Sequence, residues 1–267
     1  MYKPQSKFSK FTPKRVDHKK TSGGWEGEAR QYNDLVGERG HYYHEHVVIP
    51  KSLQLLNLKP DSSVLDLGCG QGVFSRVLPK TVSYVGVDAS KSLIDFAKKF
   101  DDNPHHRFEV LSATRPLKGL RTDFSHAVCI LALQNMEYFD TAIKNASDHL
   151  QSGGSFLIVI NHPSFRIPRQ SGWGEPIQGI QTRWVNKYMS HLKIPINMHP
   201  SDKKSAITMT YHMPLSSYVA SLRKHGFVIA QLEEWSSNKE SKGPHAKAEN
   251  TARAEFPLFL AIVAEKR

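Results

Sequence analysis

The chain has 267 residues, 39% of them hydrophobic, and a formal net charge of +11. This length predicts one large domain, with or without an insertion, and the hydrophobic content can supply its core. No apolar run approaches membrane-spanning length, and the N-terminus lacks the apolar segment of a secretory signal. Cys69 lies in a glycine-rich run and Cys129 in a predicted strand, so neither suggests a disulfide. We therefore expect a cytoplasmic protein without a membrane partner.

The positive charge is concentrated in two segments. Residues 1–20 hold seven Lys or Arg and one acid, and residues 161–215 hold seven Lys or Arg and two acids. We interpret residues 1–22 as a basic, disordered tail. The alternative is that the basic segments attract nucleic acid or another anionic surface.

Predicted helices and strands alternate through the first part of the chain. Helices over Glu28–Gly37 and Tyr42–Leu56 would form an N-terminal helical cap within residues 23–58. Strands are expected over 63–67, 82–87, 106–111, 124–131 and 153–160. Helices are expected over 71–79, 90–100 and 138–150. Such alternation is typical of a parallel sheet with helices on both faces.

The rhythm breaks at residues 161–213, which are rich in proline, histidine, arginine and aromatic residues without clear periodicity. A helix over Leu215–His225 follows, then strands over Phe227–Trp235 and Phe256–Glu265, separated by an exposed loop over Lys239–Asn250. The predicted class is α/β: a Rossmann-like, doubly wound mixed sheet of about seven strands in a single domain over 23–267. It would have an antiparallel C-terminal edge and a lid insertion after the fifth strand.

The most informative run is VLDLGCGQG over 64–72, in which a buried strand leads into three alternating glycines. Glycines at alternate positions let the backbone turn sharply and approach a ligand closely. The next predicted strand ends in Asp88, 18 residues beyond Gly70. This offset is close to the roughly 20 residues at which an acid meets a ribose hydroxyl in a βαβ nucleoside site.

The glycine register indicates which nucleoside would bind. The dinucleotide pattern G-x-G-x-x-G requires a third glycine where this chain has Val73. Asp66, just before the turn, would repel a pyrophosphate but could hold an ammonium group. A ligand with a ribose, an amino-acid end and no phosphate fits, and S-adenosylmethionine is such a ligand.

These residues resemble the class I S-adenosylmethionine-dependent methyltransferases, in particular small-molecule, type 11-like members. VLDLGCGQG is similar to the family's first motif, VGVDAS to its ribose-binding segment, and the likeness extends over roughly 60–160. The resemblance implies that the methionine part lies along Asp66, Gly68, Cys69 and Gly70, and that the ribose binds Asp88. It implies that the adenine lies against Ala89, Ala113 and Thr114, and the sulfonium beside Leu131 and Gln134. Many relatives have an Asp where this chain has Ser112.

The acceptor site should be formed by segments 41–46 and 161–213, which would cover the same edge of the sheet. His162 follows the fifth strand and His44 lies in the helical cap, and either could act as a base or serve structure. Substrate contacts are expected from Tyr43, Arg166, Arg169, Trp173 and Trp184, the arginines suiting an anionic group and the tryptophans a flat one. His41, His44 and His46 are not expected to bind a metal, since no fourth ligand is evident.

The leading hypothesis is methyl transfer to a small-molecule acceptor by in-line displacement, under a lid formed by 161–213. The first alternative is methylation of RNA or another polyanionic macromolecule, which the basic segments favour. The second is a non-catalytic relative that binds the cofactor. The sequence leaves the identity of the acceptor open.

Overall fold

The computed structural model describes residues 26, 37, 40–175, 180–197 and 207–267. The predicted tail over 1–22 lies outside these residues, as does the helix expected over Glu28–Gly37, apart from Gly37. Within the described ranges, no helix combines the length and apolar character needed to cross a membrane.

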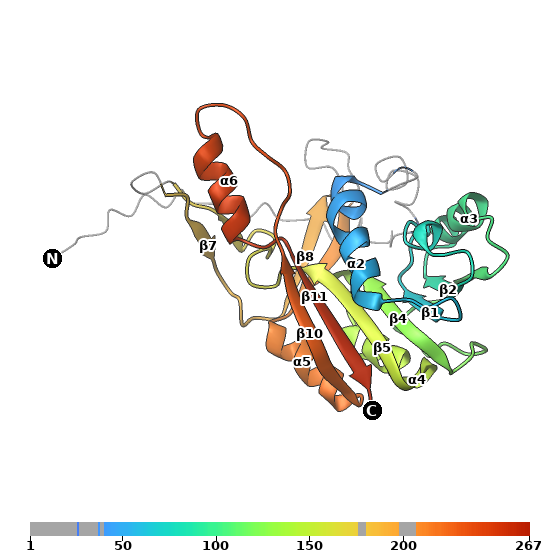
Figure 1. The fold of residues 1–267 in the computed structure, drawn as a ribbon. Coiled ribbons are helices and arrows are strands. Elements are labelled where there is room, and N and C mark those ends of the chain that lie inside the picture. Colours follow the sequence, from blue (N-terminus) through green and yellow to red (C-terminus); the bar gives the residue numbers. More distant parts are fainter. Residues whose placement is uncertain (1–25, 27–36, 38–39, 176–179, 198–206) are drawn as a thin grey trace.

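A seven-stranded mixed sheet forms the centre of the molecule, in the order β10-β11-β5-β4-β1-β2-β3 (Figure 1). Its strands are β1 (Ser63–Leu67), β2 (Ser83–Asp88), β3 (His106–Val110), β4 (Phe124–Ile130), β5 (Leu150–Asn161), β10 (Phe227–Trp235) and β11 (Phe259–Lys266). Strands β1 to β5 are mutually parallel. β11 runs antiparallel to both β5 and β10. The predicted mixed sheet with C-terminal antiparallel pairing is confirmed, and the reversed strand lies one place inside the edge.

The sheet is buried on both faces because its central strands are largely apolar. In β1, Leu65 and Leu67 pack into the core on one side and Val64 into the core on the other, as strand alternation requires. Each side chain of this kind stabilises the fold by about 1.5–3 kcal/mol through burial. The first core includes residues of α4 (Phe139–His149) and α5 (Leu215–Lys224), and the second includes residues of α2 (Ile49–Leu56) and α3 (Lys91–Phe100).

The helix expected over 71–79 is wrong. The segment consists of turns followed by one 3₁₀ turn, η3 (Ser75–Val77). Gly72 has φ of +76°, outside the helical region, and a methyl group there would lie 3.1 Å from the Phe108 ring. The Ser75 hydroxyl donates to the Gly72 carbonyl oxygen at 2.8 Å, which fixes the turn. The glycine run therefore does not end in the N-terminus of an α-helix.

The cap helix expected over Tyr42–Leu56 is present, with a π-helical segment η2 (His44–Val48) before α2. The loop expected over Lys239–Asn250 is partly wrong, because α6 (Ala246–Glu255) begins inside it. Its sequence, AKAENTARAE, is polar on most sides, and only Ala252 is buried. Apolar periodicity therefore gave no signal for this helix.

Two hairpins form the segment between β5 and α5. β6 (Ser171–Trp173) pairs with β7 (Arg183–Val185), and β8 (Leu192–Asn197) pairs with β9 (Ile207–His212), all antiparallel. In β9 the buried residues are Thr208, Thr210 and His212, while the alternating apolar residues are only partly buried. This inverted pattern explains why alternation did not identify the strand.

Candidate functional site

The glycine turn after β1 is bonded to the end of β2. The N–H groups of Gly68 and Cys69 both donate to the Val87 carbonyl oxygen, at 2.8 and 3.1 Å. Gly68 has φ of +85°, and a Cβ on it would lie 2.6 Å from the Ala132 Cβ. The turn thus touches the segment that follows β4, and only a residue without a side chain fits there.

Asp88 lies at the end of β2 and closes the other side of this turn. Its Oδ2 accepts the Gly70 N–H at 3.0 Å, and its Oδ1 accepts the Ser90 N–H at 2.9 Å. Each carboxylate oxygen retains capacity to accept a further hydrogen bond, as binding of a diol requires. Burial raises the pKa of Asp88 above its ordinary value. Nearby, the Glu26 carboxylate accepts hydrogen bonds from the hydroxyls of Ser90 and Ser92.

A pocket of about 330 Å³ opens between these groups at the carboxyl ends of the parallel strands. Seven residues that the sequence predicted for the cofactor line it: Gly68, Gly70, Asp88, Ala89, Ala113, Thr114 and Leu131. The other lining residues are Leu93, Ser112, Ile130, Ala132, Asn135, Met136, Glu137 and Tyr138. Most of this second group follow β4, so the strand ends alone could have indicated them.

Three residues predicted for the cofactor do not line the pocket. Asp66 is buried, and its Oδ2 accepts the Tyr84 hydroxyl at 2.7 Å. Burial raises the pKa of the Cys69 thiol, so it stays protonated. The Gln134 Nε2 donates to the Leu131 carbonyl oxygen at 2.8 Å, and its Oε1 is buried without a partner among the described residues. Gln134 thereby holds Leu131, whose φ is +53°.

We expect Asp66 to make stability depend on pH. Burial raises its folded-state pKa to about 7, from an ordinary value of 3.8, so folding binds a proton between about pH 4 and pH 7. Its contribution to the free energy of unfolding is therefore complete below about pH 4 and is lost as the pH rises through 7. Urea denaturation across this range should show a smaller decline in Asp66→Asn than in the native chain, because Asp88 also has a raised pKa and still contributes.

A suitable control is Asp123→Asn. A hydrogen bond from Arg121 lowers the pKa of Asp123. The contribution of Asp123 to the free energy of unfolding is therefore lost as the pH falls, which is opposite to the behaviour of Asp66. An unchanged pH slope in Asp66→Asn would contradict the assignment of this dependence to Asp66.

The segment after β3 supplies polar groups to one wall of the pocket. The Ser112 hydroxyl lies 3.0 Å from the Thr114 hydroxyl and accepts the Thr114 N–H at 3.4 Å. Asn145 donates to the Ala113 carbonyl oxygen at 2.7 Å and so fixes the segment from α4. Ser112 therefore offers a hydroxyl to the pocket.

His162 directly follows β5 and lies next to Glu234 of β10. Its Nε2 is 2.6 Å from Glu234 Oε1, and its Nδ1 accepts the Ser164 N–H at 3.2 Å. The proton of the neutral ring is therefore on Nε2, which donates to the carboxylate. Burial lowers the pKa of His162, although Glu234 opposes the shift. His162 does not line the 330 Å³ pocket.

His44 lies in the helical cap, where its ring centroid is 4.1 Å from that of His41 and the two rings are tilted by 36°. Burial lowers the pKa of His44 to about 3, and its Nδ1 is buried without a partner among the described residues. No group of three or more metal-ligating side chains occurs within the described ranges.

The two tryptophans predicted for the substrate, Trp173 and Trp184, lie on opposite faces of the β6–β7 hairpin. Trp173 pairs with Arg183, whose guanidinium carbon is 4.8 Å from the Trp173 ring centroid. Trp184 pairs with Gly172 instead, and its ring covers that glycine. Since neighbouring positions on a strand point to opposite faces, the two tryptophans do not converge on one ligand.

Arg183 of β7 lies next to the Arg166 backbone, because its Nε donates to the carbonyl oxygen of Phe165, the preceding residue. Burial lowers the pKa of Arg166, and the Tyr43 phenol opposes this shift. Arg169 is exposed, has φ of +61°, and makes no side-chain hydrogen bond or ion pair in the described part of the chain. The structure thus brings Arg183 to the segment that holds Arg166.

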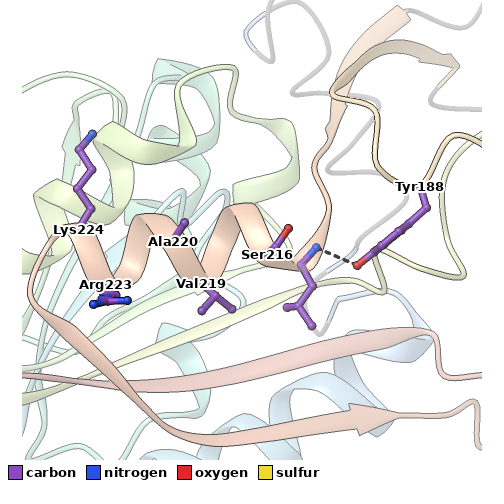
Figure 2. Close-up of a pocket in the computed structure, with 7 residues that line it drawn as sticks. Tyr188, Ser216, Val219, Ala220, Arg223 and Lys224 are labelled. Atoms are coloured by element: carbon purple, nitrogen blue, oxygen red, sulfur yellow. Dashed lines mark hydrogen bonds between the residues drawn. The ribbon is translucent and has the colours of Figure 1, made fainter.

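A larger hollow, of about 870 Å³, lies along α5 (Figure 2). The Leu215 N–H donates to the Tyr188 hydroxyl across it at 3.1 Å. Its other lining residues are Ser216, Val219, Ala220, Arg223 and Lys224, none of which the sequence predicted for a site. It shares no residue with the glycine turn.

Comparison with known proteins agrees with this geometry. Residues 65–156 match a family model described as a methyltransferase domain. A Mesorhizobium loti S-adenosylmethionine-dependent methyltransferase has 22% identity and a TM-score of 0.65, covering 83% of this chain and 99% of its own. A proposed enzyme of this type from Listeria monocytogenes has 24% identity and a TM-score of 0.62, covering 82% and 98%.

A third structure is a complex between the Haloferax volcanii Trm112 methyltransferase activator and a proposed methyltransferase. It has 15% identity and a TM-score of 0.60, covering 90% of this chain and 93% of its own. No curated protein matches the sequence. At these identities the solved structures establish the fold. The match over residues 65–156 indicates methyl transfer, and the geometry of the glycine turn is compatible with it.

Proposed function

We propose that this chain, a class I S-adenosylmethionine-dependent methyltransferase, transfers the methyl group of S-adenosylmethionine to a small-molecule acceptor. The observation that supports this acceptor class is the position of the β8–β9 hairpin at the pocket. Thr210 of β9 donates to the Gln134 carbonyl oxygen at 3.1 Å, and Tyr211 donates to Glu137 at 3.3 Å. The segment over 161–213 would thereby act as a lid within a single domain spanning 23–267.

The pocket residues fit the methyl donor. Asp88 has two acceptor oxygens for the ribose hydroxyls, and Gly68 and Gly70 admit the methionine part against bare backbone. Ala89, Ala113 and Thr114 would border the adenine, and Leu131 would lie near the sulfonium. When bound, the donor supplies an already activated methyl group, so the chain chiefly aligns the acceptor and excludes water.

His162 is the candidate for a general base, because its Nε2 donates to Glu234 and its Nδ1 becomes a proton acceptor once the hydrogen bond from the Ser164 N–H opens. His44, with its pKa near 3, would be a weak base. We expect His162→Gln to lower the rate of methyl transfer by about 10²-fold or more, with unchanged cofactor affinity. Glu234→Gln removes a carboxylate that raises the pKa of His162, so the acidic limb of the pH–rate profile, where the rate rises as His162 loses its proton, should move to lower pH. A lower melting temperature with an unchanged transfer rate in His162→Gln would contradict the role of base.

The central experiment has two stages. Isothermal titration of the full chain should show saturable binding of S-adenosylmethionine and of its demethylated product. Tritium-labelled donor should then transfer label to the low-molecular-weight fraction of a cell extract. Absence of cofactor binding would overturn the proposal, and cofactor binding without transfer to any fraction would favour the non-catalytic alternative.

Methylation of RNA or another polyanion is the second candidate. The net charge of +11 and the basic residues of the inserted segment support it. Label that enters total RNA rather than small molecules, with a rate that falls steeply as salt is raised, would favour this candidate over the first.

A further inference from the structure

Three cationic residues from separate parts of the chain lie around the end of β5, where Arg183 bonds to Phe165 and where Tyr43, under Lys239, packs on Phe259 beside Asn161. Arg166 follows β5, Arg183 lies on β7, and Lys239 follows β10. The Lys239 Nζ is 5.1 Å from the Tyr43 ring centroid, and the Tyr43 hydroxyl is 2.9 Å from the Ser237 hydroxyl. We call these four residues, Tyr43, Arg166, Arg183 and Lys239, the cationic cluster.

No carboxylate neutralises the cationic cluster in the described part of the chain. Arg166 makes no side-chain hydrogen bond or ion pair there, and Lys239 contacts aromatic rings instead of an acid. Partial burial lowers the pKa of Arg166 although the residue as a whole is exposed. Arg183 is also partly buried, and the charge of Arg166 lowers its pKa further. Like charges held together without a partner indicate a place for an anion.

Arg183 is fixed before any ligand binds. Its Nε donates to the Phe165 carbonyl oxygen at 3.1 Å, and its Nη2 donates to the same oxygen and to the Ser171 hydroxyl. Its Nη1 has no partner among the described residues. A guanidinium held on one edge, with its other edge unpaired beside Arg166, is suited to a planar or tetrahedral oxyanion.

The cationic cluster lies at the same edge of the sheet as the cofactor pocket. The Leu131 N–H donates to the carbonyl oxygen of Val159 in β5. Asn161, two residues after Val159 on the same strand, pairs with Phe259 of β11. The Tyr43 ring contacts Phe259 at 5.7 Å between centroids. From strand spacings, Phe259 is on the order of 10 Å from Leu131. One small molecule can span that distance.

We propose that the methyl acceptor carries a carboxylate or phosphate group, which binds the cationic cluster while its reacting atom faces the cofactor pocket. This rests on the proposed methyl-transfer function. Arg166 is the specificity-determining residue, because it is the cluster arginine with no structural hydrogen bond of its own. The Trp173 ring under Arg183 limits the site on one side.

The test uses the full chain labelled with ¹⁵N-arginine and follows the side-chain Nε–Hε resonances. Inorganic phosphate and acetate are titrated separately at constant ionic strength, so the two arms distinguish the two oxyanions. Resonances of Arg166 and Arg183 should shift saturably with at least one probe. Arg166→Gln should raise that dissociation constant by about tenfold or more, and Arg166→Lys should restore part of the affinity. Arg107→Gln, on the exposed edge strand β3, is the matched control and should change nothing.

The outcomes separate this inference from the proposed function. In a transfer assay, the labelled product should be retained on an anion-exchange column, and Arg166→Gln should reduce its yield while affinity for the demethylated cofactor stays within twofold. Shifts that are absent, or equal at all exposed arginines, would overturn the anionic acceptor. Failure of the unmodified chain to bind the cofactor would overturn the proposed function instead, whatever the phosphate titration shows.

Discussion

Replacing Asp88 with Ala should raise the dissociation constant of the demethylated cofactor by about 10²-fold or more. The reason is the loss of two charge-assisted hydrogen bonds to the ribose, each contributing about 1.5–3 kcal/mol. The carboxylate also accepts hydrogen bonds from the N–H groups of Gly70 and Ser90, so the variant loses these two bonds as well. Isothermal titration measures the change directly.

Asp88→Asn provides the matched control. It keeps one acceptor oxygen and nearly the same volume, so the affinity should fall by less than in Asp88→Ala. Circular dichroism should show that both variants fold, since the carboxylate lies at the end of β2 rather than within the core. Equal affinity for the native chain and Asp88→Ala would exclude the ribose-binding role.

Gly68→Ala should both destabilise the chain and abolish cofactor binding. The added Cβ would lie 2.6 Å from the Ala132 Cβ and 3.0 Å from the Met136 Cε, in a backbone conformation with φ of +85°. The left-handed conformation alone costs a residue with a Cβ about 1–2 kcal/mol, and the overlap with Ala132 adds about 1–3 kcal/mol. Urea denaturation should therefore give a free energy of unfolding lower by about 2–5 kcal/mol.

Gly119→Ala separates these two costs. Gly119 has φ of +84°, almost equal to that of Gly68, but nothing lies within 4 Å of a Cβ built there. It should show the conformational cost without the steric one, and it should bind the cofactor normally. If the two alanine variants were equally stable, the close approach between the turn and Ala132 would not constrain the fold.

The sequence was sufficient to predict the sheet, and seven of the residues that it predicted for the cofactor line one pocket. Strands such as β1 are rich in buried apolar residues, and Asp88 lies at a spacing that has a chemical meaning. Elements without an apolar pattern were missed, including β9 with its inward threonines and α6 with one buried side chain. The segment after the glycine turn resembled a helix because the conformation of Gly72 is not visible in its composition.

The acceptor side was predicted only in part, for a similar reason. Arg166 was identified from its position after β5, but Arg169 was chosen as its companion because it is close in sequence. The companion in space is Arg183, brought there by the β6–β7 hairpin and bonded to the Phe165 carbonyl oxygen. Tertiary pairing across 17 residues of irregular sequence leaves no periodic signal.

The reversed direction of β11 has an architectural consequence. β10 ends at Trp235, which pairs with Phe259 at the start of β11, so the connection between them starts and finishes at the same end of the sheet (Figure 1). Had the last strand been parallel, the chain would have had to return to the far end of the sheet first. The reversal instead keeps the connecting segment, which includes Ser237, Lys239 and α6, at one end of the sheet, where it can vary in length without disturbing the parallel strands β1 to β5.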